Sequence, residues 1–279
     1  MRIAAGVDVG STQTKAVLLT ENGGIKVLGR ALTDTGANVQ RAAQNAFDQC
    51  CRAAKIDANE VGFVVGTGYG RYKISFGNAQ MTEISCHARG AHFLCPGTRT
   101  VIDMGGQDSK AISVGASGEV LDFVMNDKCA AGTGRFLANA AEVMGISLDE
   151  IGPLALKAKR PVKITTVCTV FVESDILSYL AQGKRPEDIL GGVHLAIAKR
   201  TLSLARRVPI EAEITMTGGV ARNSGMVKAL EEVLGRSMQV SPDAHFMGAV
   251  GAAIFALEKM DQSFESGVWR SDYAAGCRN

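Results

Sequence analysis

The sequence lacks a long hydrophobic run, and we therefore expect no membrane-spanning helix and no membrane partner. No stretch approaches the roughly 18–20 apolar residues that a span needs, and the run at 248–257 is short and glycine-containing. The first ten residues lack the apolar segment of a signal peptide, so we expect a cytoplasmic protein. Lysine and arginine total 30 against 28 aspartate and glutamate, and this balance predicts no nucleic-acid partner.

Proline is scarce, at 6 residues, whereas glycine is plentiful, at 32. This combination favours close backbone approaches within regular structure, as phosphate-binding loops require. The 7 cysteines are an odd number and cannot all pair. In a chain without a secretion signal we expect thiols or metal-bound thiolates rather than disulfides.

Two widespread nucleotide-binding motifs are also absent. The sequence contains no GxxxxGK[ST] loop, and the stretch 66–70, GTGYG, lacks the spacing of the G-x-G-x-x-G fingerprint. A nucleotide site in this chain must therefore use another kind of loop.

An internal repeat is the most informative pattern in the sequence. Residues 7–17 read VDVGSTQTKAV and residues 102–112 read IDMGGQDSKAI. In both copies an aspartate is followed by glycine two positions later and by lysine seven positions later. Each copy begins a strand–turn–strand pattern, so the repeat predicts two related halves that face one nucleotide.

The turn of each copy has the chemistry of a phosphate loop. Backbone N–H groups and hydroxyls can donate to phosphate oxygens, and Lys15 can neutralise their charge. Asp8 is expected to hold Mg²⁺ through water, and Asp103, its counterpart, to orient or deprotonate the attacking water. The first motif alone also fits an ordinary strand and turn; the second copy favours the nucleotide interpretation. The predicted nucleotide-binding residues of the two turns are Gly10, Ser11, Thr12, Gln13, Thr14, Lys15, Gly105, Gly106, Gln107 and Lys110.

A third segment, 216–221 (MTGGVA), connects an expected strand to an expected helix. Gly218 and Gly219 leave bare backbone on which a ring or ribose can lie, so we predict that this segment binds adenosine.

Hydrophobic patterns predict a mixed α/β chain. Strands are expected at 3–9, 15–19, 25–32, 61–65, 100–103, 110–114, 120–125 and 213–217. Helices are expected at 38–54, 134–144, 172–181, 189–207, 225–234 and 248–260.

In this order, the three segments resemble the nucleotide motifs of actin, heat-shock chaperones and sugar kinases. The resemblance implies an α/β, two-lobed ribonuclease-H-like ATPase fold with ATP or ADP in the interlobe cleft. We place lobe I at residues 1–92 plus 248–279, and lobe II at residues 93–247.

Two cysteines stand out because each precedes a helical pattern, where a thiol pKa is lowered. Cys129 lies in MNDKCAAGTGRFL and Cys168 in CTVFVESD. A [4Fe-4S] cluster needs four thiolates, which two chains with two cysteines each could supply. The chain has no CxxC motif, and the spacing by itself leaves two buried or merely reactive cysteines as the simpler interpretation.

The same two strings resemble the cluster motifs of the CoA-enzyme activases. That family comprises the ATP-dependent activators of 2-hydroxyacyl-CoA dehydratases and the ATPase subunits of benzoyl-CoA reductases. The resemblance implies that Cys129 and Cys168 each ligate a [4Fe-4S] cluster shared with a second, identical or homologous ATPase subunit. It further implies a ferredoxin-type electron donor, and an iron–sulfur CoA-thioester reductase or dehydratase as the acceptor.

Within the family, the segment 85–94 (SCHARGAHFL) and the tail beyond about residue 260 favour an ATPase subunit of benzoyl-CoA reductase. A homodimeric dehydratase activator is the alternative. A small-molecule kinase of the same fold, or an actin-like assembly protein, would not explain Cys129 and Cys168.

Three further features have no assigned chemistry. His87 is expected to be a hydrogen-bonded structural histidine, and Arg71 to contact either phosphate or a partner. The remaining thiols are expected in the core or at the surface: Cys50, Cys51, Cys86, Cys95 and Cys277.

Overall fold

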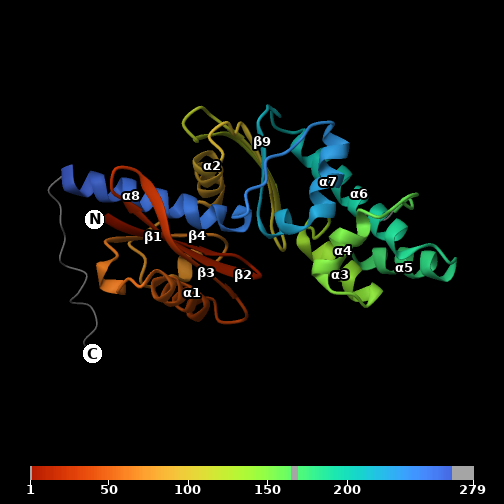
Figure 1. Ribbon diagram of the computed structural model, residues 1–279, viewed down its shortest axis with the longest axis horizontal. Helices are drawn as coiled ribbons and strands as arrows, with labels where there is room; N and C mark the ends of the chain where they lie inside the picture. Colours follow the sequence, from red (N-terminus) through yellow and green to blue (C-terminus); the bar gives the residue numbers. More distant parts are fainter. Residues whose placement is uncertain (1, 165–168, 266–279) are drawn as a thin grey trace.

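The structure is a computed structural model that describes residues 2–164 and 169–265, and it contains two separate β-sheets (Figure 1). The first sheet has the strand order β3-β2-β1-β4-β5 and the second the order β8-β7-β6-β9. The first sheet consists of β1 (Arg2–Val9), β2 (Gln13–Glu21), β3 (Ile25–Asp34), β4 (Phe63–Thr67) and β5 (Ala79–Gln80). The second consists of β6 (Thr100–Met104), β7 (Ser109–Val114), β8 (Val120–Asn126) and β9 (Ile214–Thr217).

Helices connect and cover these sheets. They are α1 (Val39–Ala54), α2 (Glu83–Leu94), α3 (Gly134–Met144), α4 (Leu148–Ala155), α5 (Thr169–Ala181), α6 (Pro186–Ala205), α7 (Ser224–Leu234) and α8 (Met247–Glu265). Within the part of the chain that the structure describes, no helix combines the length and hydropathy needed to cross a membrane.

Local sequence explains how α1 begins and ends. The Asn38 side chain accepts a hydrogen bond from the Arg41 amide, which satisfies one of the free N–H groups of the first turn. Lys55 adopts a left-handed conformation, with φ of 56°, and ends the helix. The buried face includes Ala43, Phe47 and Cys50, as the spacing predicts.

Helix α8 crosses β1 and α2 at very short range, and glycines allow this approach. A Cβ at Gly6 of β1 would overlap the Ala249 carbonyl of α8. A Cβ at Gly251 would likewise overlap the Cys86 carbonyl of α2. The chain beyond lobe II thus returns to pack on the first sheet, and α2 and α8 lie between the two sheets (Figure 1).

The internal repeat corresponds to two equivalent hairpins. In the first, β1 and β2 are antiparallel with Asp8 opposite Lys15. In the second, β6 and β7 are antiparallel with Asp103 opposite Lys110. The central strand of each hairpin also pairs in parallel with a third strand, β4 or β9. The two halves predicted from the sequence therefore share strand register as well as residue type.

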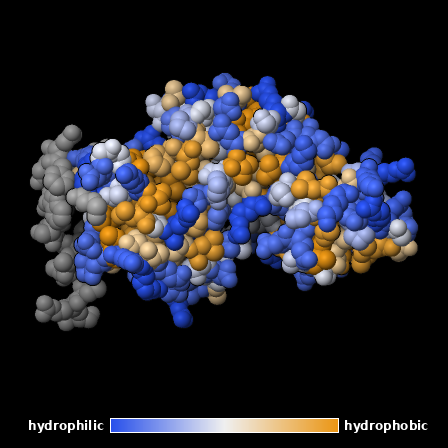
Figure 2. All heavy atoms as spheres, viewed as in Figure 1, coloured by the Kyte–Doolittle hydropathy of each residue, from blue (hydrophilic) through white to orange (hydrophobic). Residues whose placement is uncertain are grey.

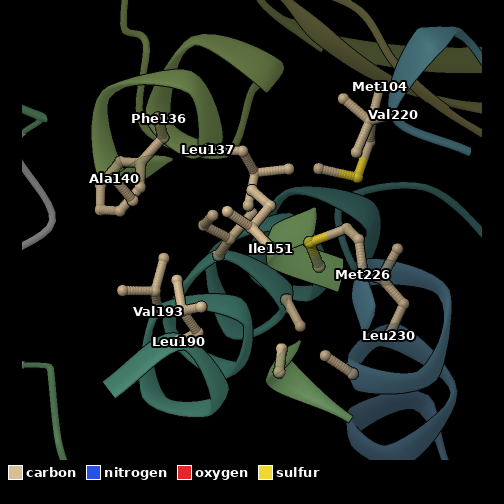
Figure 3. Packing of buried hydrophobic residues seen from close by; sticks show 14 of the residues in the cluster. Met104, Phe136, Leu137, Ala140, Ile151, Leu190, Val193, Val220, Met226 and Leu230 are labelled. Carbon is tan, nitrogen blue, oxygen red and sulfur yellow. The ribbon is translucent and has the colours of Figure 1, made fainter. Parts of the chain in front are cut away.

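The largest hydrophobic core lies beside the second sheet, among α3, α4, α6 and α7. Figure 3 shows Met104 and Val220 meeting Leu137, with Ile151 and Met226 below them. Each such side chain contributes about 1.5–3 kcal/mol when it is removed from water. This core fixes the start of α3 against the turn between β6 and β7.

Two helices were not predicted, α2 and α4. Strand β4 also extends to Thr67, so that this residue lies in the sheet and not in the glycine loop. The proposed division at residues 92 and 93 falls inside α2, which contacts β6, β7, β8 and α8. The lobe boundaries therefore stay a prediction.

Candidate nucleotide and cluster sites

The turns of the two hairpins face each other. A Cβ at Gly106 would overlap the Thr12 hydroxyl and would lie 3.8 Å from Ser11 Oγ. The amides of Gly134 and Arg135 donate to the carbonyls of the β6–β7 turn at 2.9 Å each, so the start of α3 holds this turn in place. The structure thus brings together the two predicted phosphate loops, although they are far apart in the sequence.

The equivalence of the halves extends to a Thr-Gly pair in each. Thr67 of β4 lies opposite Asp8, and Thr217 of β9 lies opposite Asp103. The following glycines, Gly68 and Gly218, have positive φ values of 85° and 88°. A Cβ on either would collide with the neighbouring aspartate, 2.8 Å from Oδ1 at Gly218. The sequence analysis missed this second match because the two Thr-Gly pairs lie in dissimilar surroundings.

The two equivalent lysines differ sharply in their contacts. Lys110 is almost fully buried, and its Nζ lies 2.6 Å from Asp108 Oδ2, 3.2 Å from Asp103 Oδ2 and 3.4 Å from Glu83 Oε1. Burial lowers the pKa of Lys110, but the three carboxylates outweigh it and raise the pKa above its usual value. This lysine is therefore neutralised within the protein.

Lys15 is only half-buried, and its Nζ contacts the carbonyl of Gln13 at 3.3 Å. No carboxylate among the described residues forms an ion pair with it. Of the two repeated lysines, Lys15 alone has a charge that is available to a phosphate.

Asp103 lies at the centre of a buried hydrogen-bond network. Its Oδ1 accepts from Thr217 Oγ1 at 2.8 Å and lies 3.2 Å from His87 Nδ1, while its Oδ2 accepts from Lys110. Burial by itself would raise the pKa of Asp103, but His87, Lys110 and Thr217 lower it to about 2. Asp103 is thus held ionised.

His87 lies between the two aspartates of the repeat. Its Nδ1 faces Asp103, and its Nε2 lies close to Asp8, since one Cβ built on Gly248 would be 3.1 Å from His87 Nε2 and 2.7 Å from Asp8 Oδ2. His87 was expected to be a structural histidine; it is hydrogen-bonded, but at the predicted site. Only the fold of α2 across both sheets reveals this position.

Replacing His87 by asparagine is expected to raise the acid-unfolding midpoint by about 0.5–1 pH unit. A carboxylate with a depressed pKa stabilises the fold above its unfolded pKa, and this stability is lost as pH falls toward about 2. Loss of His87 moves the pKa of Asp103 back up, so unfolding begins at higher pH. Circular dichroism during acid titration measures this, with His92→Asn on the same helix as the control. An unchanged midpoint for both variants would contradict the assigned contact.

The other predicted residues divide into open and enclosed positions. Gly219 is exposed, with no atom within 4 Å of a Cβ built on it, so it leaves the open backbone expected beside an adenosine. Thr12 and Gln107 are also exposed. Thr14 is buried, and its hydroxyl bonds Thr35 Oγ1 at 2.9 Å rather than facing the turn. Arg71 donates to the Gly68 carbonyl at 3.0 Å, beside the first Thr-Gly pair.

Cys129 is exposed, in the loop between β8 and α3. The Asn126 side chain holds this loop by donating to the carbonyls of Cys129 at 2.8 Å and Ala131 at 3.0 Å. Helix α3 begins only at Gly134, so the prediction that Cys129 sits at a helix N-terminus is wrong: a turn intervenes. Cys168 lies outside the described residues, directly before α5, a helix that packs against α3.

Most of the other thiols lie in the interior, as expected. Burial raises the pKa of Cys50 and of Cys86 to about 12 each, and raises that of Cys51. Cys95 is half-buried, and Cys277 lies outside the described residues. Cys129 is therefore the exposed thiol among the described cysteines.

The sequence matches the BadF/BadG/BcrA/BcrD ATPase family over residues 5–256. This chain belongs to that family. It is 43% identical, over 91% of its length and 96% of the relative's, to the activator of lactoyl-CoA dehydratase from Anaerotignum propionicum. Every turn and strand discussed above falls within the matched range.

Solved structures of two related ATPases have the same fold. The (R)-2-hydroxyglutaryl-CoA dehydratase component A of Acidaminococcus fermentans superposes with a TM-score of 0.90 at 39% identity, covering 94% of this chain and 100% of that one. The activator of 2-hydroxyisocaproyl-CoA dehydratase from Clostridium difficile, solved with bound ADPNP, gives 0.89 at 37%, covering 95% and 97%. A glucokinase from Streptomyces griseus, at 0.59 and 13%, confirms the sugar-kinase-like fold alone.

The comparisons correct the preferred branch of the family. A benzoyl-CoA reductase component from Thauera aromatica is 32% identical over 91% of this chain and 93% of its own length, well below the lactoyl-CoA dehydratase activator. The segment 85–94, which suggested the reductase branch, owes its composition to the buried face of α2 and its close crossing with α8. It is therefore not a marker of the reductase proteins.

Proposed function

We propose that this ATPase activates a 2-hydroxyacyl-CoA dehydratase by delivering electrons through a [4Fe-4S] cluster shared between two chains. The observation that carries the proposal is the asymmetry of the duplicated hairpins. One repeated lysine is neutralised by three carboxylates, whereas the other remains free beside the facing turn. Such a site binds a triphosphate on one side and positions carboxylates on the other.

The nucleotide would lie between the facing turns. Backbone amides of the turns and the Lys15 ammonium would bind its phosphates, and Gly218 and Gly219 would leave space for adenosine. Asp8 would hold Mg²⁺ through water, and Asp103 would orient the attacking water. The homologous activator that binds ADPNP supports the nucleotide assignment.

The shared cluster rests on the placement of Cys129. Among the described residues, no group of three or more histidine, cysteine or acidic side chains is placed to hold a metal. A site completed by a second chain needs only an exposed thiol in a fixed loop, and Cys129 meets this requirement. When bound, such a cluster would supply one-electron transfer.

Apolar side chains near the cysteine-bearing elements support contact with a second chain. Phe171 on α5 is 62% exposed and Leu177 is 49% exposed. Figure 2 shows hydrophobic atoms at the end of the molecule where α5 lies. Apolar residues exposed on one helix are typical of an interaction surface.

The duplicated lysines provide a matched test of the nucleotide site. We expect Lys15→Met to weaken ADPNP binding by about tenfold or more, about 1.4 kcal/mol, with an unchanged melting temperature. Lys110→Met should instead destabilise the fold by about 3–5 kcal/mol, because it leaves buried carboxylates unpaired. Calorimetric titration and thermal unfolding of both variants measure this. Equal ADPNP affinities for Lys15→Met and the parent would overturn the site.

A further inference from the structure

A polar cavity of about 140 Å³ lies beneath the loop that carries Cys129, outside the predicted nucleotide site. It is enclosed between α6, the start of β7 and the end of β8. A water molecule needs only roughly 10–15 Å³ of such space, so the cavity holds a larger group. Its lining residues are Ser109, Asn126, Ala131, Gly132, Arg200, Thr201, Ser203, Leu204 and Arg207.

The charge of this lining is entirely positive. Arg200 and Arg207 lie two turns apart on α6 and border the cavity together. No ion pair involves either arginine among the described residues, and no lining residue is acidic. Two guanidinium groups with no internal counter-charge create a site that favours an anion.

The cavity also contains a hydroxyl without a hydrogen-bond partner. Thr201 is 2% exposed, and its Oγ1 has no partner among the described residues. A Cβ built on Gly132 would lie 3.7 Å from Thr201 Oγ1, 3.9 Å from Ser109 Oγ and 3.5 Å from Arg200 Cγ. The two hydroxyls and one arginine therefore converge on Gly132. A buried hydroxyl left unbonded costs free energy, and a bound oxyanion would remove this cost.

We propose that this cavity is a phosphate-binding site, in which Arg200 and Arg207 bind the oxyanion and the Thr201 hydroxyl donates to it. A tetrahedral oxyanion presents several acceptor oxygens, which match guanidinium and hydroxyl donors. The ligand is either inorganic phosphate or the phosphate group of a larger molecule.

Occupancy of this site is linked to the cysteine loop through Asn126. This side chain lines the cavity and also holds the carbonyls of Cys129 and Ala131. Phosphate in the cavity would restrain the loop whether or not iron is bound.

Titration of the full-length protein with inorganic phosphate, at saturating ADPNP, tests the proposal. We expect Arg200→Gln and Arg207→Gln each to weaken phosphate binding by about tenfold, and Thr201→Val by about threefold. Arg206→Gln, an exposed arginine of the same segment that does not line the cavity, should bind phosphate as the parent does. Equal affinity of the parent, Arg200→Gln and Arg207→Gln would overturn the site and leave a water-filled cavity.

Hydrogen exchange locates the bound ion independently of activity. Phosphate should slow amide exchange at least threefold in residues 126–132 and leave residues 9–15 unchanged. Protection of 9–15 alone would place the ion in the nucleotide site and contradict the proposal. Repeating the experiment in the Lys15→Met chain without ADPNP keeps the result independent of the proposed ATPase function.

Coenzyme A distinguishes the two sources of phosphate. If it binds at least tenfold more tightly than inorganic phosphate and loses that affinity in Arg200→Gln, the site accepts a phosphate group of a larger molecule. If it binds no better than inorganic phosphate, the ligand is the free ion. Binding of neither probe would refute the site.

Discussion

Replacing Cys129 by serine is expected to abolish iron binding in anaerobically purified protein and to weaken association of the two chains. A serine hydroxyl is a poor substitute for a thiolate ligand, and in a shared cluster each substitution removes two of four ligands at once. The broad absorption near 400 nm should disappear, and iron content should fall to about a tenth of the parent or less. Cys168→Ser should have the same effect.

Cys95→Ser is the matched control, since Cys95 is a partly accessible thiol in another part of the chain. It should retain the iron content of the parent, and so should Cys50→Ser where that variant folds. Stoichiometric iron in both Cys129→Ser and Cys168→Ser would show that other thiols hold the metal. Loss of iron in Cys95→Ser or Cys50→Ser would lead to the same conclusion.

Asp103→Asn is expected to reduce ATP hydrolysis by about 10²–10⁴-fold while ADPNP affinity stays within about threefold of the parent. The carboxylate is held ionised with a pKa of about 2, so asparagine removes its charge while nearly keeping its shape. Binding depends instead on Lys15 and the backbone of the turns. The variant should keep its iron yet fail to sustain electron delivery to the partner.

Asp108→Asn controls for the loss of one carboxylate beside Lys110. Asp108 contacts the same lysine at 2.6 Å but lies at the edge of the turn, partly exposed. It should hydrolyse ATP within about threefold of the parent. If Asp103→Asn hydrolyses at the parent rate, or if both variants lose activity equally, the role of Asp103 is structural.

The sequence repeat was enough to predict that two hairpins would meet, because Asp, Gly and Lys recur at fixed spacing on strands that hydrogen bonds hold in register. It could not predict that the two lysines differ. Lys110 is enclosed partly by Glu83, which comes from α2 on a remote part of the chain. Contacts of this kind depend on packing between elements, which residue spacing does not encode.

His87 and α2 were missed for a related reason. The helix buries a histidine, a cysteine and a glycine on its inner face, so its sequence carries no clear stripe of large apolar residues. The close crossing with α8 stabilises it instead. For Cys129, the sequence identified the thiol but not the turn between it and α3.

Native mass spectrometry of the anaerobically purified protein tests the central claim most directly, because it counts chains and iron atoms in one complex. The account predicts two chains with a single [4Fe-4S] cluster, two bound nucleotides, and separation into single chains when iron is removed. A complete cluster on a single chain, or a two-chain complex without iron that remains intact, would contradict a cluster shared through Cys129.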